Sequence, residues 1–367
     1  MKNLILILGV LVYSFASAQN HHFTGDYAAI RYQGRILSKS KGVVELISSA
    51  AICGFQFKGD SCIISLRNIA SAGDYNYVSL EIDNEYTGRL KVTGTEMHDF
   101  TILPKNKKTE WHTLRIYKST EASNGVIEFH GVKAYALKSI PKKNAIKIEF
   151  IGNSITCGMG NDLKEIPCGN GSKWYDQHNA YWSYASITAR VLGVDFMLSS
   201  ISGAGIYRNW NSNGPTVPQQ YESAYLRIDS LRKWDFNTFT PDIVTIALGT
   251  NDLSLGDGTS PRLPFDSIAF IKEYVKFIGT IYNHYPDAQL VLLTSPMIND
   301  ERSEILYSCL QFIKNKAVLQ FPGKKKINIF RFNAVLSTGC SGHPTIEEHK
   351  MMAGQLIPFM QKLVAGL

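Results

Sequence analysis

The sequence lacks the features that would place the protein in a membrane, around a metal or on nucleic acid. Beyond the N-terminal segment, no stretch is apolar over the roughly 20 residues that a membrane-spanning helix needs. No C-x-x-C pair or His/Cys cluster with ligand spacing occurs, so we expect neither a metal nor a cofactor. The 38 Lys and Arg residues are scattered or lie in short loops, whereas a nucleic-acid surface needs them gathered on one face.

The first 18 residues have the composition of a secretory signal peptide. Lys2 precedes a mostly apolar run over residues 4–15, and the segment ends in Ala16-Ser17-Ala18. A basic start, a short apolar core and an Ala-x-Ala end predict cleavage after Ala18 and a secreted or periplasmic protein. Gln19, not a cysteine, follows the predicted cut, so no lipoprotein-type anchor is expected.

Six cysteines in an oxidising compartment could form disulfides, but the sequence leaves their pairing open. Cys53 and Cys62 flank a predicted two-residue hairpin turn at Gly59-Asp60, in which Phe57 would face Cys62 and Cys53 would face Leu66. The two cysteines would then not lie opposite each other, so we expect both to be small core residues. Cys157 and Cys168 bracket a loop and could close it. The other candidate partners are Cys309 and Cys340.

Residues 19–140 are predicted to form an all-β domain. Short runs of alternating apolar and polar residues recur there, separated by turn-rich segments, and no helical period interrupts them. The predicted strands are 42–47, 51–57, 62–66, 77–82, 111–117 and 126–135. This spacing is typical of a β-sandwich of the jelly-roll type. We expect His21 and His22, at the mature N-terminus, to be disordered.

After a linker at 139–144, residues 145–367 alternate between predicted strands and helices. The predicted strands are 146–151, 194–198, 242–248, 289–294 and 327–332. The predicted helices are 182–192, 219–234, 265–285, 303–321 and one that begins at Thr345 with a capping box to Glu348. Mostly apolar strands in this alternation predict an α/β/α domain with a five-stranded, mainly parallel sheet.

Small and polar residues follow four of these five strands. Ser154 comes after the first strand, Gly203 after the second, Asn251 after the third and His343 after the fifth. Ligands of a parallel sheet bind beyond the carboxyl ends of its strands, so these residues are expected to converge there. Acyl transfer needs a nucleophile, a base and donors for the oxyanion, which this set could supply. Ser154 would be the nucleophile and His343 the base, with the Ser154 and Gly203 amides and the Asn251 carboxamide as oxyanion donors.

In this order of motifs the chain resembles the SGNH (GDSL-like) hydrolases, whose four blocks carry Ser, Gly, Asn and His. The matching segments are Gly152-Asn-Ser-Ile-Thr156, Ser202-Gly203, Gly249-Thr-Asn-Asp252 and His343-Pro344. More narrowly, the whole mature chain resembles the second family of carbohydrate esterases, in which a jelly roll precedes the SGNH domain. That resemblance implies a secreted enzyme that removes O-acetyl groups from plant polysaccharides such as xylan or glucomannan. The substrate would be its partner, and no protein partner is evident.

Two positions depart from the pattern of the superfamily. Asn153 stands where an Asp usually precedes the nucleophile, and Cys340 stands where an orienting Asp usually lies three residues before the histidine. No other carboxylate is near His343 in the sequence, so we predict a Ser154–His343 dyad. A backbone carbonyl or Ser341 would hold the imidazole, because losing the orienting group in a serine protease costs about 10⁴ in kcat.

The sequence also offers candidates for substrate contacts and two alternative functions. Sugar rings stack on aromatic faces, and the aromatic candidates in or beside loops near the predicted mouth are Trp174, Tyr175, Trp182, Tyr207 and Trp210. For each of them, packing in the core or at the rim is the alternative role. Asn209, beside Arg208, is predicted either to contact the substrate or to lie on the surface. Asp252 either braces the loop of Asn251 or caps a helix or turn. One alternative is an esterase or lipase acting on a non-carbohydrate ester. The other is a glycan-binding protein whose active site has decayed.

Overall fold

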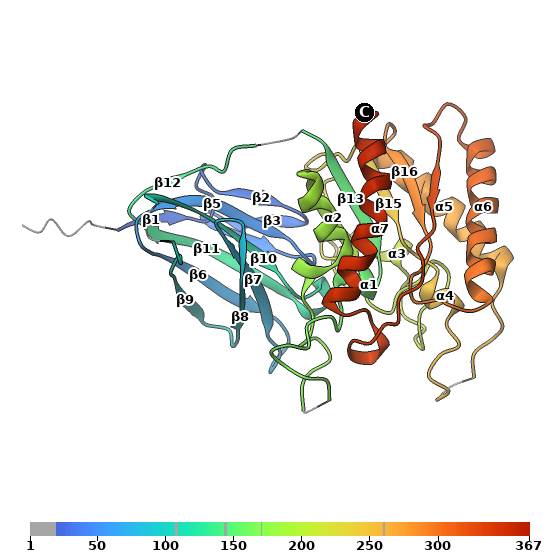
Figure 1. Ribbon diagram of the computed structural model, residues 1–367, viewed down its shortest axis with the longest axis horizontal. Coiled ribbons are helices and arrows are strands. Elements are labelled where there is room, and N and C mark those ends of the chain that lie inside the picture. The colour runs from blue at the N-terminus through green and yellow to red at the C-terminus, as the bar shows by residue number, and fades with distance from the viewer. Residues whose placement is uncertain (1–19, 107–108, 143–144, 170, 260) are drawn as a thin grey trace, which may run out of the picture.

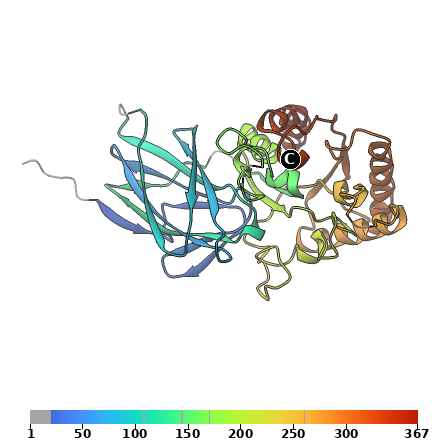
Figure 2. The same ribbon diagram turned by 90° about the horizontal axis from the view of Figure 1, so that it is seen from below.

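The computed structural model describes residues 20–106, 109–142, 145–169, 171–259 and 261–367, so the predicted signal peptide lies outside the described residues. A β-sandwich and an α/β domain lie side by side, and both views show the same arrangement (Figures 1 and 2). No helix of these described ranges is long and apolar enough to cross a bilayer. The predicted two-domain fold class is confirmed.

The sandwich consists of two antiparallel sheets of six strands each. One has the order β3-β4-β11-β6-β9, with β1 beside β11, and comprises β1 (His21–Thr24), β3 (Ile36–Ser40), β4 (Val43–Leu46), β6 (Cys62–Ile69), β9 (Met97–Ile102) and β11 (Val126–Ala134). The other has the order β12-β5-β10-β7-β8, with β2 beside β5, and comprises β2 (Arg31–Gln33), β5 (Ile52–Lys58), β7 (Asn76–Ile82), β8 (Glu85–Val92), β10 (Trp111–Lys118) and β12 (Leu137–Lys138). Alternate side chains of both sheets fill one apolar core, as the period-2 pattern requires.

Two expectations about this domain are wrong. His21 and His22 are not disordered, because β1 pairs with β11 and this pairing orders the chain start. The strands on either side of Gly59–Asp60 are not a hairpin, since β5 pairs with β2, β10 and β12 while β6 pairs with β9 and β11. The turn therefore crosses from one sheet to the other. Cys53 and Cys62 are nevertheless buried and unpaired, as expected of small core residues.

The α/β domain has a five-stranded parallel sheet with the order β14-β13-β15-β16-β17. Its strands are β13 (Lys147–Gly152), β14 (Asp195–Ser200), β15 (Ile243–Ile246), β16 (Gln289–Leu293) and β17 (Asn328–Phe330). Its helices are α1 (Ser154–Cys157), α2 (Tyr184–Leu192), α3 (Val217–Gln220), α4 (Thr250–Leu253), α5 (Ser267–His284), α6 (Arg302–Gln320) and α7 (Ile346–Ala365). One apolar core joins the sheet to α2 and α7 and another joins it to α5 and α6, so helices cover both faces. The capping box from Thr345 to Glu348 is present at the start of α7.

The predicted helix over 219–234 is wrong. The helix ends at Gln220, and the chain continues through turns in which Leu226 has a positive φ of 52°. The side chain of Leu226 is buried with Ala122 and Val126 of the sandwich. The reason is tertiary: this segment packs against the other domain, and that contact outweighs its helical periodicity.

A buried arginine of the sandwich joins the two domains. The Arg35 side chain enters the α/β domain, where its Nε donates to Ser199 Oγ at 3.1 Å and its Nη1 to the Ser223 carbonyl at 2.7 Å. Its Nη2 lies 3.9 Å from the Glu149 carboxylate, and both side chains are fully buried.

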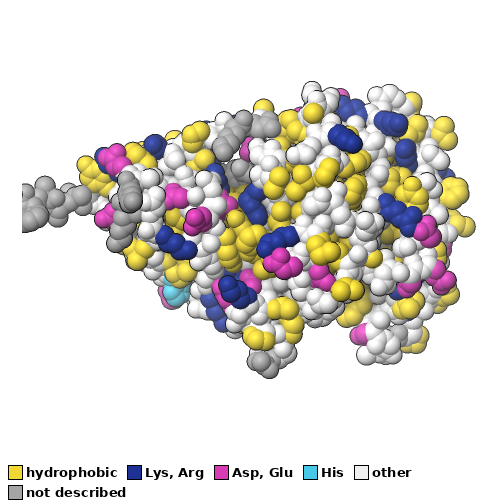
Figure 3. Space-filling model, viewed as in Figure 1, with side chains coloured by type: hydrophobic (Ala, Val, Ile, Leu, Met, Phe, Trp, Pro, Cys, Tyr) yellow, Lys and Arg dark blue, Asp and Glu magenta, His cyan; other side chains and the backbone are white. Residues whose placement is uncertain are grey.

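The surface is mixed in character: on the face drawn in Figure 3, basic side chains lie among acidic and apolar ones.

Candidate active site

Ser154 stands at a sharp turn from β13 into α1. Asn153 precedes the helix, and its side chain accepts the Ile155 N–H at 3.2 Å. A Cβ at residue 152 would collide with the Thr156 side chain, which explains the glycine there. The turn places the Ser154 side chain beyond the carboxyl end of β13, where it is 7% exposed.

The imidazole of His343 lies between Ser154 and a peptide oxygen. His343 Nε2 is 2.8 Å from Ser154 Oγ, and its Nδ1 is 3.0 Å from the Ser341 carbonyl oxygen. A carbonyl can only accept, so Nδ1 carries the hydrogen and Nε2 is free to accept the Ser154 hydroxyl. Of the two supports weighed from the sequence, the backbone of Ser341 is the one that holds the ring. Glu348 is engaged elsewhere, accepting the N–H groups of Thr338 and Thr345.

Burial keeps this imidazole neutral. Desolvation lowers the pKa of His343 from its ordinary value of 6.5, although the Ser341 and Cys340 backbone and the Glu121 carboxylate raise it in part. A neutral ring at neutral pH is the form that can take a proton from the serine hydroxyl.

A disulfide holds the loop that carries His343. Cys340 is bonded to Cys168, with their Cα atoms 5.5 Å apart. The suggested bridge between Cys157 and Cys168 is therefore wrong: Cys157 is a buried free thiol under the nucleophile turn. The Gly160 carbonyl also accepts the Cys340 N–H at 2.9 Å, so two links tie the histidine loop to the segment that follows Ser154.

The predicted oxyanion donors come from the loops on either side of β13. Gly203 follows β14 and has a φ of 74°, which favours glycine although a Cβ would meet open space there. Asn251 lies in α4, after β15, and its Nδ2 donates one hydrogen to the Ala204 carbonyl at 2.8 Å. Since β14 and β15 both pair with β13, the three loops leave the sheet at the same edge. The carboxamide therefore has a second hydrogen to offer beside the Gly203 turn.

Asp252 braces the loop that follows β14. Its buried carboxylate accepts the N–H groups of Ile206 and Tyr207 at 3.0 and 2.9 Å, and that of Arg208 at 3.3 Å. Burial raises the pKa of Asp252 above its ordinary value, although the hydrogen bonds from these N–H groups oppose the rise in part. Of the two interpretations left open, the contacts favour the loop brace.

Four of the predicted substrate contacts differ in how much surface they offer. Trp210 is 45% exposed. The Asn209 side chain is used within its loop, where it accepts the Gly205 N–H and donates to the carbonyls of Gly214 and Pro215. Tyr207 packs its ring on Phe265 and Phe270, and Trp182 packs on Tyr86 and Tyr181 at the domain boundary. Their roles in substrate binding stay predictions, with Trp210 the best placed of the four.

One residue near the site, Glu121, escaped sequence analysis, whereas Trp174 is among the aromatic candidates that the sequence indicates. Glu121 reaches the site from the sandwich, where its carboxylate accepts the Ser202 N–H at 3.0 Å. Trp174, 49% exposed, stacks edge-on against the fully buried His178, whose pKa is lowered well below its ordinary value by burial and by His343. No motif marks the Glu121 contact, because Glu121 and Ser202 lie 81 positions apart in the sequence.

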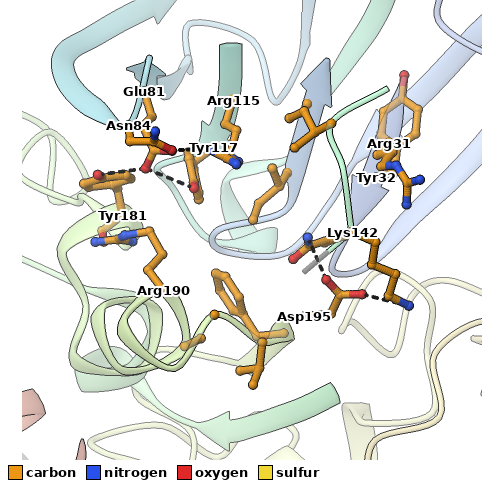
Figure 4. Close-up of a pocket in the computed structure, with 18 of the residues that line it drawn as sticks. Arg31, Tyr32, Glu81, Asn84, Arg115, Tyr117, Lys142, Tyr181, Arg190 and Asp195 are labelled. Atoms are coloured by element: carbon orange, nitrogen blue, oxygen red, sulfur yellow. Dashed lines mark hydrogen bonds and ion pairs between the residues drawn. The ribbon is translucent and has the colours of Figure 1, made fainter. Parts of the chain in front are cut away.

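A separate cavity lies away from this site. It has a volume of about 510 Å³ and lies between the domains, near Asp195 at the start of β14, whereas Ser154 follows the end of β13 (Figure 4). Its charged groups are mostly paired with one another, Glu81 with Arg115 and Asp195 with Lys142. Within the described ranges, no three His, Cys, Asp or Glu side chains are grouped so as to hold a metal ion.

This geometry defines a class. A serine hydroxyl bonded to a neutral imidazole at the carboxyl edge of a parallel sheet, beside a glycine turn and a carboxamide, is typical of serine ester hydrolases. Two family models match the chain: the carbohydrate esterase 2 N-terminal domain over residues 32–142, and the GDSL-like lipase/acylhydrolase family over residues 150–316.

Similar proteins span both domains. The acetylxylan esterase/glucomannan deacetylase of Cellvibrio japonicus is 26% identical over 315 residues, which is 83% of this chain and 82% of the relative. The cellulase/esterase CelE of Acetivibrio thermocellus is 32% identical over 251 residues, or 67% of this chain, but this chain spans only 29% of CelE.

The solved structures agree with the sequence relatives. A family two carbohydrate esterase from Clostridium thermocellum, in complex with cellohexaose, superposes with a TM-score of 0.80 at 26% identity, over 92% of this chain and 100% of that one. An acetyl xylan esterase from Butyrivibrio proteoclasticus superposes with a TM-score of 0.79 at 21% identity, over 95% and 98%. The chain is a GDSL-like hydrolase with the two-domain organisation of the family 2 carbohydrate esterases.

Proposed function

We propose that the protein is a secreted or periplasmic serine esterase that removes O-acetyl groups from plant cell-wall polysaccharides or oligosaccharides. The observation that carries this proposal is the chain of contacts from Ser154 Oγ to His343 Nε2, and from His343 Nδ1 to the Ser341 carbonyl, at 2.8 and 3.0 Å. The names of the relatives, acetylxylan esterase and glucomannan deacetylase, support the substrate class. The signal-peptide pattern and the disulfide support export.

The reaction proceeds through an acyl-enzyme. Ser154 Oγ attacks the acetyl carbonyl carbon while His343 Nε2 takes the hydroxyl proton. The oxyanion accepts hydrogen bonds from Gly203 N–H, the free hydrogen of Asn251 Nδ2 and Ser154 N–H. His343 then gives its proton to the sugar oxygen, which leaves as a hydroxyl. A water molecule, deprotonated by His343, attacks the acetyl-serine carbonyl. The bond from Ser154 Oγ to the acyl carbon then breaks, His343 returns the proton to Ser154 Oγ, and acetate leaves.

A peptide carbonyl replaces the usual carboxylate in this scheme. In a serine protease most of the cost of losing the aspartate, about 10⁴ in kcat, comes from the wrong tautomer. The Ser341 carbonyl oxygen can only accept a hydrogen bond, so the ring nitrogen that faces it, Nδ1, must carry the hydrogen. This selects the tautomer in which the unprotonated Nε2 faces the nucleophile. The orienting role is therefore kept without a charge on Ser341.

The substrate is expected to cross the exposed aromatic surface beside the site. Trp210 and Trp174 are both about half exposed, and indole faces of this kind stack on sugar rings. We place a sugar subsite at Trp210. This residue lies next to the Gly203 loop, because its backbone N–H donates to the Gly203 carbonyl at 2.8 Å.

The decisive experiment measures acetate release from acetylated xylan, acetylated glucomannan and simple sugar acetates, with Ser154→Ala as the control. We expect the wild type to release acetate and Ser154→Ala to lose about 10³-fold or more in kcat while still binding the polymer. Binding without turnover by the wild type would favour the decayed glycan-binding protein instead. Faster cleavage of nitrophenyl octanoate than of nitrophenyl acetate would favour a lipase.

A further inference from the structure

A carboxylate of the sandwich lies inside the proposed catalytic centre. Glu121 follows β10 and precedes a single 3₁₀ turn at Ala122–Asn124, and it is 2% exposed. Its Oε2 accepts the Ser202 N–H at 3.0 Å and lies 2.9 Å from Cys157 Sγ. One oxygen therefore touches both the loop after β14 and the helix that begins at Ser154.

The donors to this carboxylate are well defined. Burial and the nearby Glu121 charge raise the pKa of the Cys157 thiol well above its ordinary value, so Cys157 stays protonated and donates its S–H. The other oxygen, Oε1, accepts the Ser123 hydroxyl at 2.6 Å. The backbone of Glu121 is held too, because Lys118 Nζ donates to its carbonyl at 2.7 Å, and burial lowers the pKa of Lys118 to about 7.

The contact controls the peptide that should bind the oxyanion. Ser202 immediately precedes Gly203, whose φ of 74° sets the direction of the turn. Glu121 holds this turn at the Ser202 N–H, and Asn251 holds it on the other side at the Ala204 carbonyl. An oxyanion donor works only when it is fixed before the reaction, and a displacement of about 1 Å can cost 10² in rate.

The sandwich is docked rigidly at this point. Ala122 and Val126 pack with Leu226, and Ile201 of the β14 loop joins this apolar cluster. The Ala180 N–H also donates to the Ser119 carbonyl across the domain boundary at 3.0 Å. Glu121 therefore has a fixed platform from which to hold the turn.

We propose that Glu121 of the β-sandwich is a positioning residue of the esterase centre, which locks the Ser202–Gly203 turn against the helix of Ser154. This inference rests on the function proposed above. It implies that the sandwich contributes to the reaction by positioning the catalytic groups, and that it does more than line a substrate groove.

The charge of Glu121 also acts on the base. It is one of the groups that raise the pKa of His343 against the effect of burial. The other titratable neighbours of the ring, His178 and His349, have pKa values lowered by burial and stay neutral. A negative charge near His343 favours the imidazolium that forms when the ring takes the Ser154 proton. With Cys340 in place of an aspartate, this charge comes from another domain.

The test compares Glu121→Gln with the matched variant Glu45→Gln. Glu45 is a second buried carboxylate of the sandwich that bonds the α/β domain, through Tyr225 Oη at 2.6 Å, but it touches no residue of the site. We expect Glu121→Gln to lower kcat by about 10-fold or more with KM changed less than about 2-fold. The acid limb of the pH profile of kcat/KM for Glu121→Gln should move to lower pH, because the charge that raises the pKa of His343 is lost. Glu45→Gln should keep wild-type kcat and the wild-type limb.

Three outcomes would overturn the inference: wild-type kcat and limb in Glu121→Gln, an equal loss in Glu45→Gln, or a loss confined to thermal stability. If Glu121→Gln does not fold, Cys157→Ala and Cys157→Ser replace it. The alanine variant removes a donor to Glu121 and should lose activity, whereas the serine variant keeps a donor and should recover it. Failure of the proposed function is separate, since the wild type would then release no acetate.

Discussion

At the scale of single residues, the base of the dyad depends on one backbone conformation. Ser341 has a positive φ of 55°, unusual for a residue other than glycine, and its carbonyl accepts from His343 Nδ1. The strain is supported on both sides of the turn, since the Gly339 N–H donates to the His343 carbonyl at 2.7 Å and the His343 N–H to the Cys340 carbonyl at 3.2 Å. The ring is thus oriented by the fold of its own loop.

The protonation of His343 sets the acid limb of the pH profile. Burial lowers the pKa of His343 below 6.5, and only the neutral ring can accept the Ser154 proton. We therefore expect kcat/KM to be constant through neutral pH and to fall only as the pH drops below 6.5, with the midpoint under that value. A pH-stat titration of acetate release measures this. Enzyme held at each acidic pH and assayed again at neutral pH controls for unfolding, and a midpoint above 6.5 contradicts the argument.

At the scale of elements, the catalytic loops are tied to one another at the carboxyl edge of the sheet. Asn251 links the β15 loop to the β14 loop, and Asp252 holds the same β14 loop through three N–H groups. The disulfide from Cys168 to Cys340 links the loop after Ser154 to the loop of His343, across 172 residues of sequence. These links fix the positions of loops that have no regular secondary structure to hold them.

Loss of the disulfide should free the histidine loop. A bridge that closes so long a segment restricts the unfolded chain strongly, so Cys168→Ser should lower the free energy of unfolding by about 2–4 kcal/mol. We expect kcat to fall as well, because Cys340 lies three residues before His343. Calorimetry and acetate release measure the two effects.

The control for this variant is a reductant. The free cysteines are buried: Cys53, Cys62, Cys157 and Cys309. Mild reduction should therefore lower the stability and kcat of the wild type to the values of Cys168→Ser, and it should leave the stability and kcat of that variant unaltered. An oxidised variant with wild-type Tm and kcat would show that the bridge has no structural role.

At the scale of the whole molecule, the two domains share charged groups that neither could bury alone. Glu149, in β13, accepts hydrogen bonds from the Ser199 and Tyr221 hydroxyl groups at 2.5 and 2.9 Å and faces the Arg35 guanidinium of the sandwich. Burial raises the pKa of Glu149, and the Arg35 charge is the largest of the effects that lower it. The guanidinium lies over the rings of Tyr221 and Trp234, about 5 Å from each centroid.

Removal of the arginine should destabilise the whole molecule. Arg35→Met leaves the Glu149 carboxylate buried without its cation, and loss of one partner of a buried pair typically costs about 3–5 kcal/mol. The double variant Arg35→Met/Glu149→Gln removes both charges and should recover much of that loss. Urea unfolding monitored by circular dichroism measures all three proteins. Equal midpoints for wild type and Arg35→Met would show that the pair contributes nothing to domain docking.

Much of the fold could be predicted because its signals are local. The parallel strands are apolar runs that end in small residues, α5 keeps a helical period, and α7 starts at a capping box. Predictions failed where a distant contact decides the local structure. Segment 219–234 leaves its helix after Gln220 and packs on the sandwich, and β1 is ordered by pairing with β11, which comes much later in the sequence.

The sequence by itself determined the class of the fold and the order of the four site blocks, because strand period and turn chemistry are properties of neighbouring residues. Only the tertiary structure decided the disulfide partner of Cys168, the oxygen that holds His343, and the contact that Glu121 of the sandwich makes with the α/β domain. Each of these depends on where a side chain or a carbonyl points after packing. Glu121 and Ser202 are 81 positions apart, and nothing adjacent to either records that they meet.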